Sequence, residues 1–140
     1  MTSVVGELPV RVYYEDTDHG GGVYYANYLR FFERGRTELL RALGFEQDEL
    51  ARNHQVLFVV RRVEVDYLRP AVFNDRLRVV SEVSDLGRAR VVFDQAVYRE
   101  GELRPLCQAS VEVACVEPKA FRPARIPEGI RRALGYGGQT

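Results

Sequence analysis

Residues 15–43 read EDTDHGGGVYYANYLRFFERGRTELLRAL, which joins an acidic turn, three consecutive glycines and a helix-forming segment. Asp16 and Asp18 come just before Gly20–Gly22. Glycines allow backbone conformations closed to other residues and let a ligand approach the chain closely. The first N–H groups of a helix have no partner within it, so its start favours negative charge or a polarised carbonyl oxygen. A carboxylate beside such an end can attack a carbonyl or direct a water at it, which is typical of an acyl-transfer site.

The same residues also fit structural and metal-binding explanations. Asp and Gly clusters mark turns, and Asp before a helix is a common cap. A calcium loop beginning at Asp16 is excluded, because Gly20 and Asn27 stand where a third oxygen ligand and a bidentate glutamate belong. A transition metal at His19 is disfavoured, because His54 is the only other histidine and no ligand pair has helical spacing. We therefore expect no metal, and the structural explanation of the turn stays open beside the catalytic one.

The composition is that of a globular chain of 140 residues with 20 basic and 20 acidic side chains. This length favours a single domain, with a core over about residues 9–123 and a frayed tail at 135–140. Balanced charge implies no general attraction to nucleic acid or to an anionic membrane. No apolar run approaches the roughly 20 residues that cross a bilayer, and the N-terminus lacks the features of an export signal. We therefore expect a cytoplasmic protein.

The two cysteines, Cys107 and Cys115, lie eight residues apart in one predicted strand. At about 3.3 Å per residue the strand separates them by about 26 Å, too far for a disulfide between them. Both fall on an apolar face, and no histidine is near either in sequence. The pattern therefore predicts buried structural thiols.

Apolar residues recur at helical spacing after the glycines and predict a long amphipathic helix up to Leu43. The buried face is expected to contain Tyr28, Phe32, Gly35, Leu39 and Leu43. Gly35 on this face costs about 1 kcal/mol relative to alanine, so we expect it to pack closely on a sheet. Gly44 is placed for a left-handed helix end. Two further short helices are expected at 46–53 and 127–134.

Alternating apolar and polar residues predict about five strands, four of them consecutive and so readily antiparallel. We expect them at 9–15, 56–69, 77–83, 91–97 and 103–115. In the second strand, Leu57 and Val59 share the apolar parity of Val63, Val65 and Tyr67. One helix covers only one face of such a sheet, so a second copy of the chain is the simplest cover for the rest.

Three runs carry a resemblance to a known family: RVYYEDTDHGGGVYYANYLRFFERGRTELLR (11–41), FVVRRVEVDYLRPA (58–71) and VVFDQAVYR (91–99). The chain resembles the YbgC-like acyl-CoA thioesterases of the 4-hydroxybenzoyl-CoA thioesterase branch of the hotdog fold, from about Val10 to Pro123. The resemblance implies an α+β hotdog fold, with an antiparallel sheet of about five strands wrapped around one long central helix. It also implies hydrolysis of a small-molecule acyl-CoA, in homodimers or homotetramers with sites at the interface. Coenzyme A would be part of the substrate, and no cofactor is expected.

The resemblance also assigns roles to residues. The second Asp of the D-x-D motif, Asp18, corresponds to the catalytic carboxylate. The backbone N–H of Tyr25 corresponds to the group that polarises the thioester carbonyl, with Gly22 and Tyr24 as further candidates. The phosphates of coenzyme A are expected at Arg88 and Arg90, with Arg61 and Arg62 as weaker candidates. The acyl pocket is expected to contain Tyr24, Tyr25, Phe58 and Tyr67.

Two positions depart from the family pattern. Tyr25 replaces the histidine usual in YbgC-like proteins, although the 4-hydroxybenzoyl branch has a tyrosine there, and His19 replaces a small residue or proline. Hydrolysis of acyl-CoA, with Asp18 as nucleophile or as general base, is the first hypothesis. An acyl-CoA-binding or scaffold protein with little turnover is the second. Hydration or dehydration of an acyl chain is disfavoured, because neither histidine is placed for it.

Overall fold

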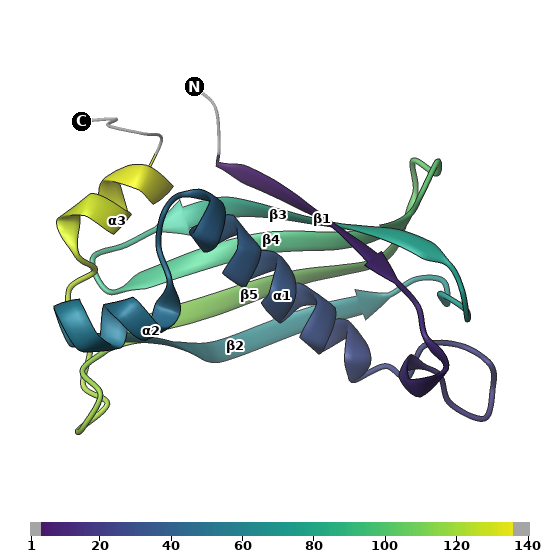
Figure 1. Cartoon of the computed structure of the whole chain (residues 1–140), viewed down its shortest axis with the longest axis horizontal. Coiled ribbons are helices and arrows are strands. Elements are labelled where there is room, and N and C mark those ends of the chain that lie inside the picture. The colour runs from purple at the N-terminus through teal and green to yellow at the C-terminus, as the bar shows by residue number, and fades with distance from the viewer. Residues whose placement is uncertain (1–3, 136–140) are drawn as a thin grey trace.

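Five antiparallel strands form one sheet with a long helix against one face (Figure 1). The computed structural model describes residues 4–135. The strands are β1 (Val5–Arg11), β2 (Leu57–Tyr67), β3 (Arg76–Leu86), β4 (Arg90–Arg99) and β5 (Pro105–Val116). Their order in the sheet is β1-β3-β4-β5-β2, so β1 and β2 are the two edges. The predicted α+β architecture is confirmed.

The long helix α1 (Asn27–Ala42) packs over β1, β3 and β4. Its buried side chains include Tyr28, Phe31 and Phe32, in agreement with the predicted face. Gly35 lies where the helix packs tightly on the sheet: a Cβ added there would sit 2.7 Å from Ser81 Oγ and 3.0 Å from Val79 Cγ1. The predicted reason for a glycine at this position, close packing on the sheet, is confirmed.

Beside Gly35, a polar bridge of Ser81, Gln95 and Arg36 joins the sheet to α1. Gln95 Nε2 donates to the Phe32 carbonyl (2.9 Å) and to Ser81 Oγ (2.7 Å). Arg36 Nη1 donates to Gln95 Oε1 at 2.9 Å. Ser81 and Gln95 are buried, and desolvation lowers the pKa of Arg36. The buried polar groups of this bridge therefore have partners, which avoids the cost of unpaired ones.

The helix ends match the expectations. Gly44 has φ +97°, and the Phe45 N–H donates to the Leu40 carbonyl at 2.9 Å, the bond that closes a left-handed helix end. The second helical segment is α2 (Gln47–Glu49) continued by η2 (Leu50–His54), and the last is α3 (Glu128–Leu134). Ile130 and Leu134 belong to the main core, which thus extends past the expected segment 9–123. Of the expected tail at 135–140, residues 136–140 lie outside the described residues.

The prediction of a first strand at 9–15 is wrong in its bounds. Strand β1 ends at Arg11, and a short 3₁₀ turn, η1 (Tyr14–Asp16), follows. The Asp16 carboxylate accepts the Tyr13 N–H at 2.8 Å. An Asp side chain that bonds nearby backbone competes with strand pairing, which explains why the alternation around Tyr13 does not produce a strand.

The predicted parity of the second strand is wrong in its first half. Val60 pairs with Val113 but Arg62 pairs with Glu112, so β2 contains a β-bulge between them. A bulge inserts one residue and reverses the faces of the residues before it. Phe58 and Val60, paired with the buried Cys115 and Val113, therefore share the inner face with Val63, Val65 and Tyr67, and Leu57 and Val59 do not.

The last strand begins later than predicted. Strand β5 starts at Pro105, and Leu103 is 92% exposed in the preceding turn. That turn contains Gly101 at φ +85°, which stops regular pairing. Cys107 and Cys115 are both buried and unpaired on β5, as predicted. Burial raises the pKa of Cys107 to about 12 and that of Cys115 to about 11.

Candidate active site

Residues 17–23, here called the glycine loop, form a tight turn before α1. The Asp18 N–H donates to the Gly22 carbonyl at 3.0 Å, and Thr17 and Val23 form an antiparallel bridge. Asp18 Oδ1 accepts the Gly20 N–H at 2.9 Å. Among residues 4–135, no donor bonds the other carboxylate oxygen, Oδ2. Asp18 is exposed, so this oxygen is available to react.

Asp16 differs from Asp18 because its polar atoms are taken up within the turn. Its Oδ2 accepts the Tyr13 N–H at 2.8 Å, and its carbonyl accepts the Tyr24 N–H at 2.8 Å. The Asn27 side chain donates to the same carbonyl at 3.1 Å. These bonds fix the entry of the chain into α1.

Two backbone N–H groups at the start of α1 are unengaged. The Asn27 N–H, the first of the helix, already donates to the Tyr24 carbonyl at 2.8 Å. The Tyr24 N–H is bonded to Asp16, but within the described chain the N–H groups of Tyr25 and Ala26 have no acceptor. The Tyr25 carbonyl accepts the Tyr67 hydroxyl at 3.1 Å, which holds this peptide in place. Two donors are therefore available beside the glycine loop.

Four tyrosines gather at this end of the sheet. Ring centroids are 4.8 Å apart for Tyr24 and Tyr25, 6.1 Å for Tyr25 and Tyr67, and 5.5 Å for Tyr28 and Tyr67. The side-chain hydrogen bond between Tyr24 and Tyr25 is the main cause that raises the pKa of Tyr24, and the Asp18 carboxylate adds to it. Phe58 is separated from this cluster, because it lies at the other end of β2.

The arginine candidates do not meet Asp18 within one chain. Arg88 and Arg90 follow β3 at the end of the sheet near α3, opposite the glycine loop (Figure 1). Arg90 pairs with Asp85 at 2.6 Å. Arg61 lies in the bulge of β2, 3.8 Å from Glu112, and Arg62 pairs with Glu64 at 3.1 Å.

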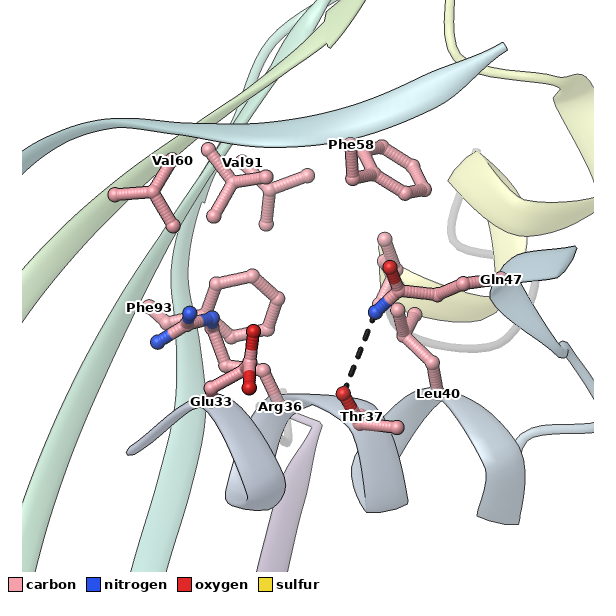
Figure 2. A pocket seen from close by; sticks show the side chains of 11 residues that line it. Glu33, Arg36, Thr37, Leu40, Gln47, Phe58, Val60, Val91 and Phe93 are labelled. Carbon is pink, nitrogen blue, oxygen red and sulfur yellow. Dashed lines mark hydrogen bonds between the residues drawn. The ribbon is translucent and has the colours of Figure 1, made fainter. Parts of the chain in front are cut away.

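A groove runs between α1 and β2, and sequence reasoning did not find it. Its deeper part is a cavity of about 140 Å³ in which Glu33, Arg36 and Thr37 of α1 face Phe58 and Val60 of β2 (Figure 2). A second hollow, which shares Glu33, Arg36 and Val60 with it, extends toward Leu29 and Val63. The groove could not be predicted, because it depends on the β-bulge that turns Val60 inward. No residue type in the sequence marks this bulge.

The support of the glycine loop was also missed. The Val23 N–H donates to the Ala71 carbonyl at 2.8 Å, and Gly22 bridges to Val72. In the sequence, Pro70 indicated only the end of a strand. In the part of the chain that the structure describes, no group of three or more His, Cys, Asp or Glu side chains could hold a metal, and no helix is long and apolar enough to cross a bilayer.

The model of the thioesterase-like superfamily matches residues 12–134. The chain therefore belongs to this superfamily. Its five-stranded antiparallel sheet and long helix are the hotdog fold of that group.

Within the superfamily, several similar proteins are of the YbgC type. The chain is 46% identical to the acyl-CoA thioesterase YbgC of Haemophilus influenzae, over 92% of this chain and 93% of that protein. It is 42% identical to the acyl-CoA thioester hydrolase YbgC of Escherichia coli O6:H1, over 93% and 96%. Among solved structures, a probable thioesterase from Bartonella henselae has a TM-score of 0.82 and 37% identity, over 88% of this chain and 99% of that one. The chain is thus a YbgC-like member, as its motifs indicated.

Proposed function

We propose that this protein hydrolyses an acyl-CoA thioester to a free carboxylic acid and coenzyme A. One observation carries the proposal: within residues 4–135, the exposed Asp18 carboxylate has an unengaged oxygen beside a helix start where the N–H groups of Tyr25 and Ala26 are also unengaged. A carboxylate and preorganised donors are the two components that acyl transfer needs. The names of the YbgC relatives support the same substrate class.

Two routes are compatible with this geometry. In the first, Asp18 Oδ2 bonds to the acyl carbon, the C–S bond breaks, coenzyme A leaves as a thiolate that takes up a proton, and water then hydrolyses the mixed anhydride. In the second, Asp18 takes a proton from a water, whose oxygen bonds to the acyl carbon as the C–S bond breaks; coenzyme A leaves as a thiolate, which takes up the proton that Asp18 received. In both, the Tyr25 N–H donates to the developing oxyanion. Tyr24 is the weaker donor candidate, since its N–H already bonds Asp16 at 2.8 Å.

We further propose that a second copy of the chain completes the site. Strand β2 is an open edge, and Val60 and Val63 on it are 50% and 37% exposed. Antiparallel pairing of two such edges would reverse the second copy, so that its β3–β4 turn lies at the glycine-loop end of the first. Arg88 and Arg90 of that turn would then be available for the coenzyme A phosphates, which attract arginine. The expected assembly is a homodimer, or a homotetramer built from such dimers.

The direct test is a panel of short, long and aromatic acyl-CoAs, with free thiol and bound ligand measured in parallel. We expect turnover of at least one member by the wild-type protein. Asp18→Asn should bind the same acyl-CoA but release thiol at least about 100-fold more slowly. Tight binding without turnover by the wild-type protein would make it an acyl-CoA-binding protein instead.

A further inference from the structure

The segment Pro70–Asp75, here called the support segment, carries the glycine loop. Its Ala71 carbonyl accepts the Val23 N–H at 2.8 Å, and Val72 bridges to Gly22. On the other side, the Ala71 N–H donates to the Tyr28 hydroxyl of α1 at 3.0 Å. A Cβ on Gly22 would sit 3.3 Å from Pro70 Cβ. The glycine loop thus rests directly on the backbone of the support segment.

The ends of the support segment are joined by one side chain, Arg99 at the end of β4. Its Nε donates to Asp75 Oδ2 at 3.0 Å, and its Nη2 donates to the Pro70 carbonyl at 3.1 Å. The same Asp75 oxygen accepts the Val72 N–H at 2.9 Å. The guanidinium therefore bonds both ends of the segment, and through Asp75 it fixes the residue that bridges to Gly22.

Arg99 is itself held in place. Its Nη1 donates to Glu102 Oε2 at 3.0 Å, and the other oxygen of Glu102 accepts Arg69 Nη2 at 3.0 Å. The hydrogen bond from Arg99 is the main cause that lowers the pKa of Glu102. The side chains of Arg99 and Asp75 are only 28% and 16% exposed, so their charge-assisted bonds are partly shielded from water.

We propose that Arg99 is a positioning residue of the active site, which acts on Asp18 through the support segment. This inference rests on the proposed function for its catalytic readout. The connection runs from Arg99 to Pro70 and Asp75, then through Ala71 and Val72 to Gly22 and Val23. It ends at the Asp18 N–H, which donates to the Gly22 carbonyl at 3.0 Å. Every step is a hydrogen bond, a bridge or the peptide bond between neighbouring residues.

The planar fork is what makes Arg99 suited to this role. Three of its nitrogens bond acceptors in three directions, namely Asp75, Pro70 and Glu102. A lysine ammonium is a compact charge that can keep the Asp75 contact but not this spread of acceptors. Without the Arg99 guanidinium, the support segment loses its bonds to β4. The Asp18 carboxylate of the glycine loop then loses its fixed position. Displacement of a catalytic group by about 1 Å can cost about 100-fold in rate.

The test compares Arg99→Met with wild type by amide hydrogen exchange and by kinetics. We expect exchange of the Val23 N–H to rise about tenfold or more, because its acceptor Ala71 loses the support that Arg99 gives through Pro70 and Asp75. We expect kcat to fall by about 10- to 100-fold with KM within about threefold. Arg99→Lys should fall between the two. Unchanged exchange at Val23 would overturn the proposal, whatever happens to thermal stability.

Arg41→Met is the matched control. Arg41 also bonds two carboxylates, Glu38 and Glu46, but it lies at the far end of α1. We expect it to lower stability without changing Val23 exchange or kcat, whereas an equal change in both variants would show that Arg99 only stabilises the fold. If Arg99→Met does not fold, Asp75→Asn removes the charge pair and keeps an acceptor for the Val72 N–H. Because exchange needs no substrate, a failure of Asp18→Asn to lose activity would refute the proposed role of Asp18 in hydrolysis and leave this inference to be judged on exchange alone.

Discussion

The glycine loop and the polar bridge under α1 are both polar, but they are built in opposite ways. In the loop, backbone groups make nearly all the bonds, and the Asp18 carboxylate is exposed, with one oxygen that no described residue bonds. In the bridge, Gln95 and Ser81 are buried, and Gln95 makes three bonds to the carbonyl of Phe32, to Ser81 and to Arg36. Polar groups that are fully paired fix the position of the helix. An unpaired, exposed carboxylate is what a reaction can use.

The two aspartates of the loop region, Asp16 and Asp18, should differ strongly in their effect on activity. Asp18→Asn keeps an oxygen for the Gly20 N–H but removes the negative charge, so kcat should fall at least about 100-fold with little loss of stability. Asp16→Asn keeps the acceptor for Tyr13, and its activity should stay within about tenfold of wild type. Thiol release and thermal unfolding of both variants check this. Equal losses of activity would mean that Asp18 has no special role.

The polar bridge should contribute measurably to the free energy of unfolding. Gln95→Leu leaves the Phe32 carbonyl, Ser81 and Arg36 without their partner, so the free energy of unfolding should fall by roughly 2–3 kcal/mol. Gln108→Leu on the exposed face of β5 is the control, and it should change stability by less than about 0.5 kcal/mol. Urea unfolding measures both. A difference below about 0.5 kcal/mol between the two variants would show that the bridge does not secure the helix.

A smaller effect is expected at the contact between helix and sheet. The Cβ of Gly35→Ala would lie 2.7 Å from Ser81 Oγ, so the free energy of unfolding should fall by about 1–2 kcal/mol despite the higher helix propensity of alanine. Gly129→Ala in α3 meets nothing within 4 Å and should be neutral or stabilising. Denaturant unfolding of the pair is the measurement. Stabilisation of both variants would contradict the close contact.

The smallest effect concerns the thiols, which take no part in either region. With pKa values of about 12 and about 11, Cys107 and Cys115 hold a thiolate fraction of about one in a thousand or less at pH 8. The native protein should therefore react very slowly with a thiol reagent at pH 8, and both thiols should react after unfolding. This also excludes the protein's own thiols as a background in the thiol-release assay. Fast reaction of the native protein would contradict their burial.

Local and long-range contacts also differ in how well the sequence predicts them. Features set by local chemistry were predictable: the helix face, the role of Gly35, the left-handed Gly44 and the buried cysteines. The motif around Asp18 was enough to indicate the superfamily. The parity of Phe58 and Val60 was not predictable, because a β-bulge depends on pairing with a distant strand and no residue type marks it.

The same limit applies to the supports of the site. Arg99, Asp75 and Ala71 act on the glycine loop through contacts with residues tens of positions away in the chain. An arginine at the end of a strand, an aspartate in a turn and an alanine after a proline are all common. None of them indicates a supporting role in the sequence. Only the register of β4 against its neighbours and the turn after β2 bring them together.

In the proposed mechanism, Asp18 faces an acyl carbon whose oxygen is held by the start of α1. The most direct measurement is a crystal structure with a non-hydrolysable acyl-CoA analogue, in which a ketone replaces the thioester. We predict that the ketone oxygen lies about 2.7–3.1 Å from the Tyr25 nitrogen. We also predict that an Asp18 carboxylate oxygen lies about 3–3.5 Å from the carbonyl carbon, directly or through one water. An analogue whose carbonyl lies in the groove between α1 and β2, with Asp18 bonded only to Gly20, would contradict the proposed roles of Asp18 and of the Tyr25 N–H.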